Sequence, residues 1–259
     1  YELLADMGWN SDSIDLDDWM KIYCEARYGG YPDAMKEAWK LFRKTAYSSL
    51  YSYPRFTWQT VVPDQRRISK IDLSDDYLQA IRLYASCADE LKNSELYRND
   101  LIEFVSYYVA AKAENFYKQA LKDDSENRVL AAQRNLQQTV DLLIDVDRLL
   151  ASHPLYRLEE WVELARNSGT TLQEKDAYEA NAKRLITSWG GIQEDYAARF
   201  WSGLIKDYYI PRIQLYFTKD RNKIREWEEQ WITSPWSNST TPFDDPVKAA
   251  LGLIEKTNK

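Results

Sequence analysis

The sequence predicts an all-α fold, a bundle of about nine or ten mostly antiparallel helices. Apolar residues recur at helical spacing along most of the 259 residues, and there are only 8 glycines and 8 prolines for tight turns. No segment shows the clean alternation of polar and apolar residues that is typical of a half-buried strand. A repeat of fixed period, which would indicate a solenoid, is also missing from the sequence. We therefore expect residues 1–259 to form a single helical domain.

Two helices are expected near the N-terminus. Asp15 is placed to accept hydrogen bonds from the first turn of one helix. Gly29 and Gly30 end that helix, because glycine readily adopts the left-handed conformation of a helix C-terminus. Pro32 then stands where a first-turn proline is tolerated. The apolar stripe of the second helix consists of Met35, Ala38, Trp39, Phe42 and Ala46.

Residues 51–73 interrupt this pattern, with neither a helical period nor strand alternation. The segment contains Arg55 and Trp58 among several other aromatic residues. A long irregular loop inside a compact domain is often functional, and a packed surface loop is an equally good interpretation.

The middle of the chain carries three longer helical patterns. Ser74 and Ser94 are each placed to cap a helix, and the pattern over residues 126–151 ends before His153 and Pro154. The last of these helices has its apolar face at Leu136, Val140, Leu143 and Leu150. Spacings of three, four and seven residues are typical of a helix that buries one side.

Five further helices are expected toward the C-terminus. A short one around Trp161 closes near Gly169, and Thr171 with Glu174 forms a capping box that begins the next. Another helix ends or kinks at Pro211, because proline lacks the N–H that a helix interior needs. This helix is expected to carry Tyr196, Phe200, Leu204 and Tyr208. The last two helices are expected around Trp227 and Trp231 and after Asp245-Pro246, with a loop over residues 234–245 between them.

The net charge of −7 excludes several classes of partner. Acidic residues are spread along the chain and would repel a phosphate backbone, so no nucleic acid is expected as a partner. The longest apolar run, residues 104–111, is far shorter than the ~18 residues that span a bilayer, so no membrane insertion is expected. The 10 Trp and 19 Tyr either pack between helices or line a surface that stacks on sugars or bases.

Few residues suit independent chemistry. Cys24 and Cys87 are expected to be two buried thiols, and His153, the single histidine, to be a surface or capping residue. One histidine cannot build a His-rich metal site, and neither a nucleophile elbow nor a phosphate-binding glycine loop is present in the sequence. We expect no metal, no cofactor and no catalytic residue in this chain. The acidic pairs Asp17-Asp18, Asp75-Asp76 and Asp123-Asp124 lie at expected helix ends, where they offset the helix dipole.

The most informative stretch is residues 187–217. Gly190 or Gly191 is placed to end a helix, and Gly203 permits close helix packing. The stretch contains Trp189-Gly190, Asp195-Tyr196-Ala197, Gly203-Leu204 and Tyr208-Tyr209-Ile210-Pro211-Arg212. Earlier in the chain stand Gly8-Trp9, Ile14-Asp15-Leu16, Trp19, Arg27-Tyr28-Gly29 and Ala38-Trp39. As a combination, these motifs resemble the C-terminal helical domain of the α-N-acetylglucosaminidases, glycoside hydrolase family 89.

The resemblance implies a role within a larger hydrolase. In that family a (β/α)8 barrel precedes the helical domain, supplies both catalytic carboxylates, and removes terminal α-linked N-acetylglucosamine with retention through a covalent glycosyl-enzyme. The chain opens on Tyr1 without a Met, and we expect it to be a fragment of such a hydrolase, inactive without its barrel. The implied partners are the barrel of the same polypeptide and glycans ending in α-linked N-acetylglucosamine.

The resemblance also implies which residues face the sugar. Trp189 would wall the pocket, with Ile192 and Tyr196 as neighbours and Trp58 on a second loop near the cleft. The implied location is periplasmic or secreted in a bacterium, or lysosomal in a eukaryote, although this segment has no signal peptide. Two alternatives remain: a free-standing helical module that binds a glycan or a peptide, and a purely structural helical domain.

Overall fold

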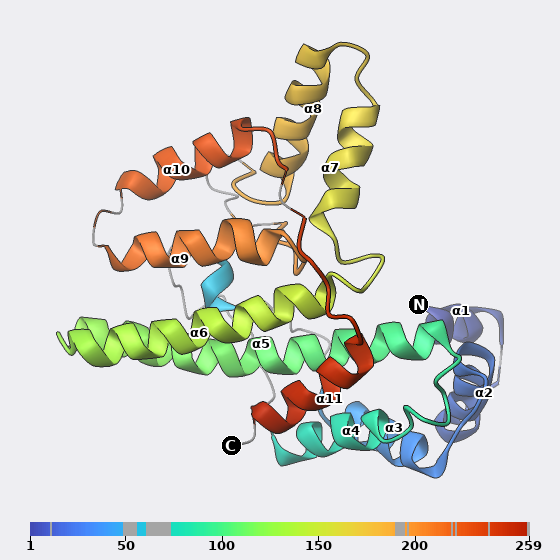
Figure 1. Ribbon diagram of the computed structural model, residues 1–259. Coiled ribbons are helices and arrows are strands. Elements are labelled where there is room, and N and C mark those ends of the chain that lie inside the picture. Colours follow the sequence, from blue (N-terminus) through green and yellow to red (C-terminus); the bar gives the residue numbers. More distant parts are fainter. Residues whose placement is uncertain are drawn as a thin grey trace. The chain divides into compact units, whose positions relative to one another are not determined.

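The computed structural model of the 259-residue chain describes residues 1–10, 12–48, 56–60, 74–189, 195, 197–218, 220, 222–237 and 239–257. Over these residues the fold is all-α, as predicted, with eleven α-helices, a 3-10 turn, a π-helical segment and no β-strand (Figure 1). One helix more is present than the sequence predicts, α1 (Glu2–Trp9), which buries none of its residues. The chain divides into two compact units, Tyr1–Ser49 with Ser74–Leu101 and Leu50–Leu73 with Ile102–Lys259.

The first unit is built around helices whose ends follow from local sequence. Its elements are α1, α2 (Leu16–Tyr28), α3 (Asp33–Lys44), α4 (Asp75–Ala85) and the start of α5 (Glu95–Ser125). Asp15 accepts the backbone N–H groups of Asp17 and Asp18, and Gly29 ends α2 with a φ of 80°. Ser74 accepts an N–H from the first turn of α4. These predicted caps are confirmed, because each needs partners only two or three residues away.

Aromatic rings and one ion pair fill the core of the first unit. Tyr84 and Tyr97 stack with their ring centroids 4.9 Å apart. Arg27 donates two hydrogen bonds to the two carboxylate oxygens of Asp100, each of 2.8 Å, and the Tyr28 hydroxyl donates a third. The two cysteines, Cys24 and Cys87, are buried and free, so the prediction of two buried thiols is confirmed.

The second unit begins with a long helical hairpin. The remainder of α5 is followed by α6 (Val129–Leu150), and Asn127, with a φ of 58°, lies in the turn between them. The Asn135 side chain of α6 donates a 2.7 Å hydrogen bond back to Asp123 of α5. Asn tolerates the left-handed region better than most residues, which suits this turn.

The other helices of the second unit form smaller pairs. They are α7 (Leu158–Asn167), α8 (Leu172–Leu185), α9 (Ile210–Phe217), α10 (Asn222–Thr233) and α11 (Pro246–Lys256). The predicted capping box of α8 is confirmed, since Thr171 accepts the N–H of Glu174 and Glu174 accepts that of Thr171. Lys256 of α11 forms an ion pair of 2.6 Å with Asp145 of α6. None of the described helices is both long and apolar enough to cross a membrane.

The helix that contains Pro211 begins later and ends later than predicted. The described residues between Trp189 and Leu204 are not helical, and the helix continues past Pro211 to Phe217. A π-helical segment, η3 (Ile205–Tyr209), lies immediately before the proline, and the Ile210 N–H reaches the Ile205 carbonyl. This wider turn accommodates a residue without an N–H, so the helix neither ends nor breaks at the proline.

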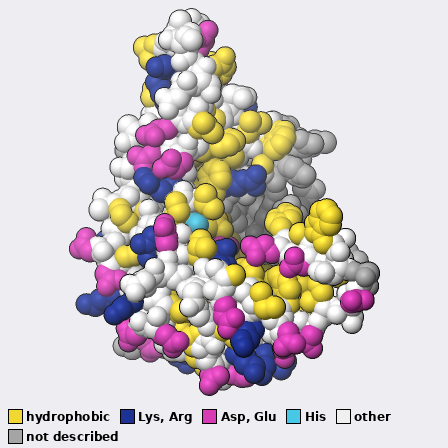
Figure 2. Space-filling model, turned by 90° about the vertical axis from the view of Figure 1, so that its right-hand side faces the viewer, with side chains coloured by type: hydrophobic (Ala, Val, Ile, Leu, Met, Phe, Trp, Pro, Cys, Tyr) yellow, Lys and Arg dark blue, Asp and Glu magenta, His cyan; other side chains and the backbone are white. Residues whose placement is uncertain are grey.

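The surface mixes charges of both signs. Figure 2 shows acidic and basic side chains distributed over the face that it presents, without one basic patch. This distribution agrees with the net charge of −7. A field of this kind offers no attraction to a polyanion.

Candidate functional site

Trp189 stands on a strained turn directly after α8. Its backbone N–H donates to the Arg184 carbonyl at 2.8 Å, and its φ is 45°, in the left-handed region. A bulky side chain is rare at such an angle, which costs roughly 1–2 kcal/mol. The indole is nevertheless 39% exposed. The fold therefore holds a large aromatic ring toward solvent in an unfavourable backbone conformation, a pattern that is common at functional sites.

A hydrogen bond closes the base of the loop that follows this turn. The Asp195 N–H donates to the Thr187 carbonyl at 2.9 Å, so the chain leaves and returns at one point. Thr187 is fully buried, and its hydroxyl donates to the Lys183 carbonyl of α8 at 2.7 Å. Asp195 is also in the left-handed region, with a φ of 59°. Asp195 is thus joined to Thr187, which is itself bonded to α8.

Arg212 forms a buried hub that contacts Asp195. Its side chain is 2% exposed, and Nη1 lies 2.9 Å from both Asp195 and Glu228. The second terminal nitrogen, Nη2, donates to the Gln59 carbonyl at 2.7 Å. The guanidinium also lies over the ring of Tyr208, 4.7 Å from its centroid. One cation therefore ties together the base of the Trp189 loop, α9, α10 and the segment around Gln59.

Electrostatics keep this hub charged. Burial alone would lower the pKa of Arg212, but Asp195, Tyr208 and Glu228 raise it well above its ordinary value. Burial also raises the pKa of Tyr208 well above its usual range, and its hydroxyl donates to Glu228 at 2.8 Å. A buried ion that loses one partner is strongly destabilising, so the hub requires all of its members.

Trp58 belongs to the core. It lies in the 3-10 turn η1 (Thr57–Gln59), has no exposed surface, and stacks on Phe56 at 4.9 Å between ring centroids. Its ring also packs edge-on against Tyr209, at 5.6 Å. The backbone N–H of Thr57 donates to the buried Glu114 of α5. These contacts fix the segment whose Gln59 carbonyl binds Arg212.

The four residues expected to face a sugar thus have different surroundings. Trp189 is exposed, Trp58 is buried, and Ile192 and Tyr196 lie outside the described residues, as does Arg55. The pocket-facing roles stay predictions. The observed contacts of Trp58 are those of a residue that supports the site from within.

Sequence reasoning did not find the hub itself. Asp195 and Arg212 stand in the quoted motifs, but only the glycines and Pro211 received a physical interpretation there. Glu228 and Gln59 carried no signal at all, because an ion pair across 16 residues and a hydrogen bond to a carbonyl 153 residues away have no local pattern. The one available signal was a single arginine directly after Tyr-Tyr-Ile-Pro in an acidic chain.

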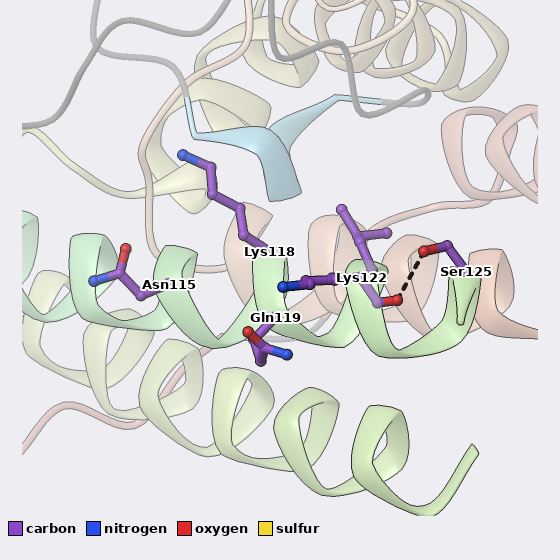
Figure 3. Close-up of a pocket in the computed structure, with 6 residues that line it drawn as sticks. Asn115, Lys118, Gln119, Lys122 and Ser125 are labelled. Atoms are coloured by element: carbon purple, nitrogen blue, oxygen red, sulfur yellow. Dashed lines mark hydrogen bonds between the residues drawn. The ribbon is translucent and has the colours of Figure 1, made fainter. Parts of the chain in front are cut away.

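Three other features of the described residues bear on the search for a site. Among the described residues, no group of three His, Cys, Asp or Glu side chains could hold a metal ion. His153 is buried and accepts the Leu155 N–H through Nδ1 at 3.1 Å, so of the two expected alternatives, surface or capping residue, it is the capping one. A hollow of about 510 Å³ runs along α5 beside Lys118 and Lys122 (Figure 3). Its described lining comes from this one helix, so those residues do not enclose a ligand.

Comparison with solved structures shows where this fold occurs. Structures of a family 89 glycoside hydrolase from Clostridium perfringens superpose with a TM-score of 0.85 over 98% of this chain, at 24% identity. These structures contain PUGNAc and 2-acetamido-1,2-dideoxynojirmycin. A further one, of a variant of that enzyme, contains its substrate GlcNAc-α-1,4-galactose. The shared feature is the fold of a helical domain, which makes up 33% of those chains.

The family follows from sequence comparison. A family model described as the α-N-acetylglucosaminidase (NAGLU) C-terminal domain matches residues 19–256, and the chain belongs to that family. Human α-N-acetylglucosaminidase is 29% identical over 233 residues, which cover 83% of this chain and 30% of the human protein. The chain therefore spans about a third of the length of the relatives that it matches.

Proposed function

We propose that this chain is the C-terminal helical part of an exo-acting α-N-acetylglucosaminidase. In this role it packs on the catalytic barrel and walls the pocket that hydrolyses terminal α-linked N-acetylglucosamine with retention. The observation that carries the proposal is the exposed indole of Trp189, held on a strained turn above the buried Arg212 hub. The proposed parent is exported in a bacterium or lysosomal in a eukaryote.

The wall acts by shape and by exclusion of water. An indole presents a flat apolar face, and the C–H groups of a pyranose ring stack on such a face while its hydroxyls stay hydrogen-bonded elsewhere. Because the turn is anchored at Thr187 and Asp195, little conformational entropy is lost when the sugar binds. We propose Ile192 and Tyr196 as neighbours of Trp189, and Trp58 as a supporting core residue.

The catalytic carboxylates are proposed to lie in the barrel. Retaining hydrolysis needs an acid and a nucleophile roughly 5–5.5 Å apart, both able to reach the glycosidic bond. Two acids of the described part of this chain, Asp195 and Glu228, are buried and bound to Arg212. Both carboxylates are buried and engaged by the Arg212 guanidinium, so these two suit a structural role.

The test is an assay of this chain and of its full-length parent on an aryl α-N-acetylglucosaminide. The parent is expected to turn over and the chain alone is not. In the parent, Trp189→Ala should raise KM and lower kcat/KM by about 10- to 100-fold, the equivalent of one lost stacking contact. Robust turnover by the chain alone would overturn the proposal, as would an unchanged kcat/KM in the variant.

A further inference from the structure

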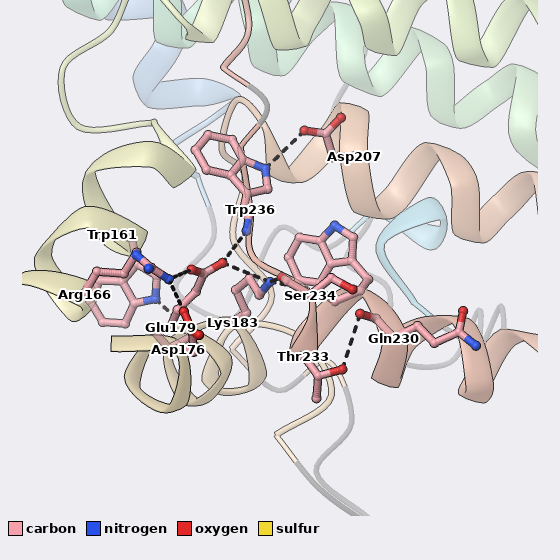
Figure 4. Close-up of polar contacts among 12 residues, drawn as sticks. Trp161, Arg166, Asp176, Glu179, Lys183, Asp207, Gln230, Thr233, Ser234 and Trp236 are labelled. Atoms are coloured by element: carbon pink, nitrogen blue, oxygen red, sulfur yellow. Dashed lines mark hydrogen bonds and ion pairs between the residues drawn. The ribbon is translucent and has the colours of Figure 1, made fainter. Parts of the chain in front are cut away.

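Buried charges hold an irregular segment, residues 234–237 and 239–240, against α8. Glu179 accepts the backbone N–H of Trp236 at 2.5 Å, and Lys183 donates to the Ser234 carbonyl (Figure 4). Glu179 and Lys183 are 2% and 1% exposed and lie 3.2 Å apart as an ion pair. Removing such ions from water costs several kcal/mol each, so they are not incidental to the position of this segment.

Two more acids hold the same segment from its other side. Asp207 accepts the indole N–H of Trp236 at 3.2 Å, and Asp147 accepts the Thr240 hydroxyl. Burial raises the pKa of both carboxyls. Three buried charged groups and the partly buried Asp207 thus fix a segment whose described residues have no regular secondary structure, and Trp236 is bound through both its backbone and its ring. Such preorganisation is what a binding surface requires.

The fixed segment forms one side of a groove of about 600 Å³. The opposite side comes from α7, and α8 closes one end. Its lining includes Trp236 with Glu159, Glu163, Arg166, Asn167 and Lys175. A volume of this size accommodates a small ligand.

The polar groups of the groove have unused hydrogen-bonding capacity. Arg166 binds Asp176 at 2.8 Å and Glu179 at 2.6 Å, both through Nη1, and its side chain is 27% exposed. Its remaining N–H groups have no protein partner among the described residues. Within the same part of the chain, neither Glu163 nor Lys175 forms an ion pair. Donors and acceptors of both signs therefore line one space together with Trp236.

This combination selects the chemistry of a ligand. A phosphate would meet the carboxylates of Glu159 and Glu163, and an ammonium would meet Arg166 and Lys175. A neutral ring with many hydroxyls can use donors, acceptors and the aromatic edge together. We propose that this groove is an accessory binding site for a neutral saccharide.

The groove lies away from the Trp189 turn. Lys175 is near the start of α8 and Trp189 follows its end at Leu185, so the rise of the helix between Lys175 and Leu185 separates them by about 15 Å. The accessory site therefore does not depend on the proposed pocket wall, and each can fail alone.

The test is a titration of this chain with the disaccharide GlcNAc-α-1,4-galactose, observed by NMR at the indole N–H of Trp236. The expected result is a saturable shift with a Kd on the order of 1 mM, typical of a shallow sugar site. Glu163→Gln and Lys175→Met should each weaken binding about fivefold, the loss of one hydrogen bond to a charged group. Neither residue has a described ion-pair partner, so both variants should fold.

Matched controls separate this site from others. Glu160→Gln changes an acid on the same helix that does not line the groove and should leave the Kd within about twofold. Trp189→Ala should leave the Trp236 shift unchanged. The proposal is overturned if no saturable shift occurs, if Trp189→Ala abolishes it, or if inorganic phosphate produces the shift and the disaccharide does not.

Discussion

Arg212 and Asp195 form a buried ion pair, with 2.9 Å between Nη1 and the carboxylate, that joins α9 to the residue closing the Trp189 loop. Asp195 holds a left-handed backbone conformation, with a φ of 59°, at the place where it also donates to Thr187. The strain at this position is offset by a cation that reaches three other partners. The position of an exposed aromatic ring thus depends on a residue that no solvent reaches.

Removal of the hub cation should be costly. Arg212→Met leaves Asp195 and Glu228 buried without a counter-charge, which we expect to destabilise the fold by about 3–5 kcal/mol. The matched control is Arg184→Met, because Arg184 pairs with Glu229 at 2.7 Å with side chains 37% and 56% exposed. An exposed pair contributes about 0–1 kcal/mol. Urea unfolding of both variants measures the difference, and similar losses would contradict this account.

The two tryptophans should separate stability from activity. Trp58→Ala removes a fully buried ring and should cost about 3–5 kcal/mol in the free energy of unfolding. Trp189→Ala removes a ring that is 39% exposed and should cost about 1 kcal/mol or less. In the full-length parent, Trp189→Ala should lower kcat/KM per folded molecule more than Trp58→Ala does. Equal losses of stability would contradict the assignment of Trp58 to the core.

Asp147 should make stability depend on pH. Burial raises its pKa from the ordinary 3.8 to about 6, while hydrogen bonds from Thr240 and from the Lys206 and Gly203 backbone act in the opposite direction. Because the folded state binds the proton more tightly, this group favours folding below about pH 4, and the contribution is lost as the pH rises through about 6.

The variant Asp147→Asn isolates that contribution. Its amide oxygen can accept the Gly203 and Lys206 N–H groups, and its NH2 can donate to the two hydroxyls nearby. Between pH 4 and 6 the stability of the wild type should fall relative to the variant. Thermal unfolding at a series of pH values measures both curves, and parallel curves would exclude Asp147 as the titrating group.

Gly203 should not tolerate a side chain. Its φ is +83°, and a Cβ there would lie 3.2 Å from Leu158 Cβ and 3.2 Å from Trp236 Cζ2. Gly203→Ala is therefore expected to cost about 2 kcal/mol or more. Gly252→Ala in α11 meets no atom within 4 Å and should stabilise the helix by up to about 1 kcal/mol. Opposite signs in thermal unfolding are the expected result, and equal signs would contradict it.

The two thiols should be inert in the native state. Burial raises the pKa of Cys24 to about 12 and that of Cys87 to about 11, so almost no thiolate forms at pH 8. An aromatic disulfide reagent should modify neither cysteine in native protein and both in denaturant. Rapid modification before unfolding would show that a thiol is accessible.

Local chemistry explains which parts of the fold could be predicted. Asp15, Ser74 and Thr171 cap helices through neighbours a few residues away, so the sequence alone indicates where α2, α4 and α8 begin. The helix through Pro211 could not be placed in the same way. Its first turn donates to Asp147, 56 residues earlier in the chain, and its π-helical segment accommodates the proline.

The sequence by itself determined the all-α class, most helix ends, the two buried thiols and the family. It did so because periodicity and capping act over a few residues. Trp58 lies within a segment without helical periodicity and Trp189 lies next to one. The sequence around them does not tell which of the two rings is buried. Only the tertiary structure decided that one ring is buried and the other exposed, and that Arg212 joins their segments. Burial and ion pairing depend on what distant helices bring into contact, and a local pattern does not contain that information.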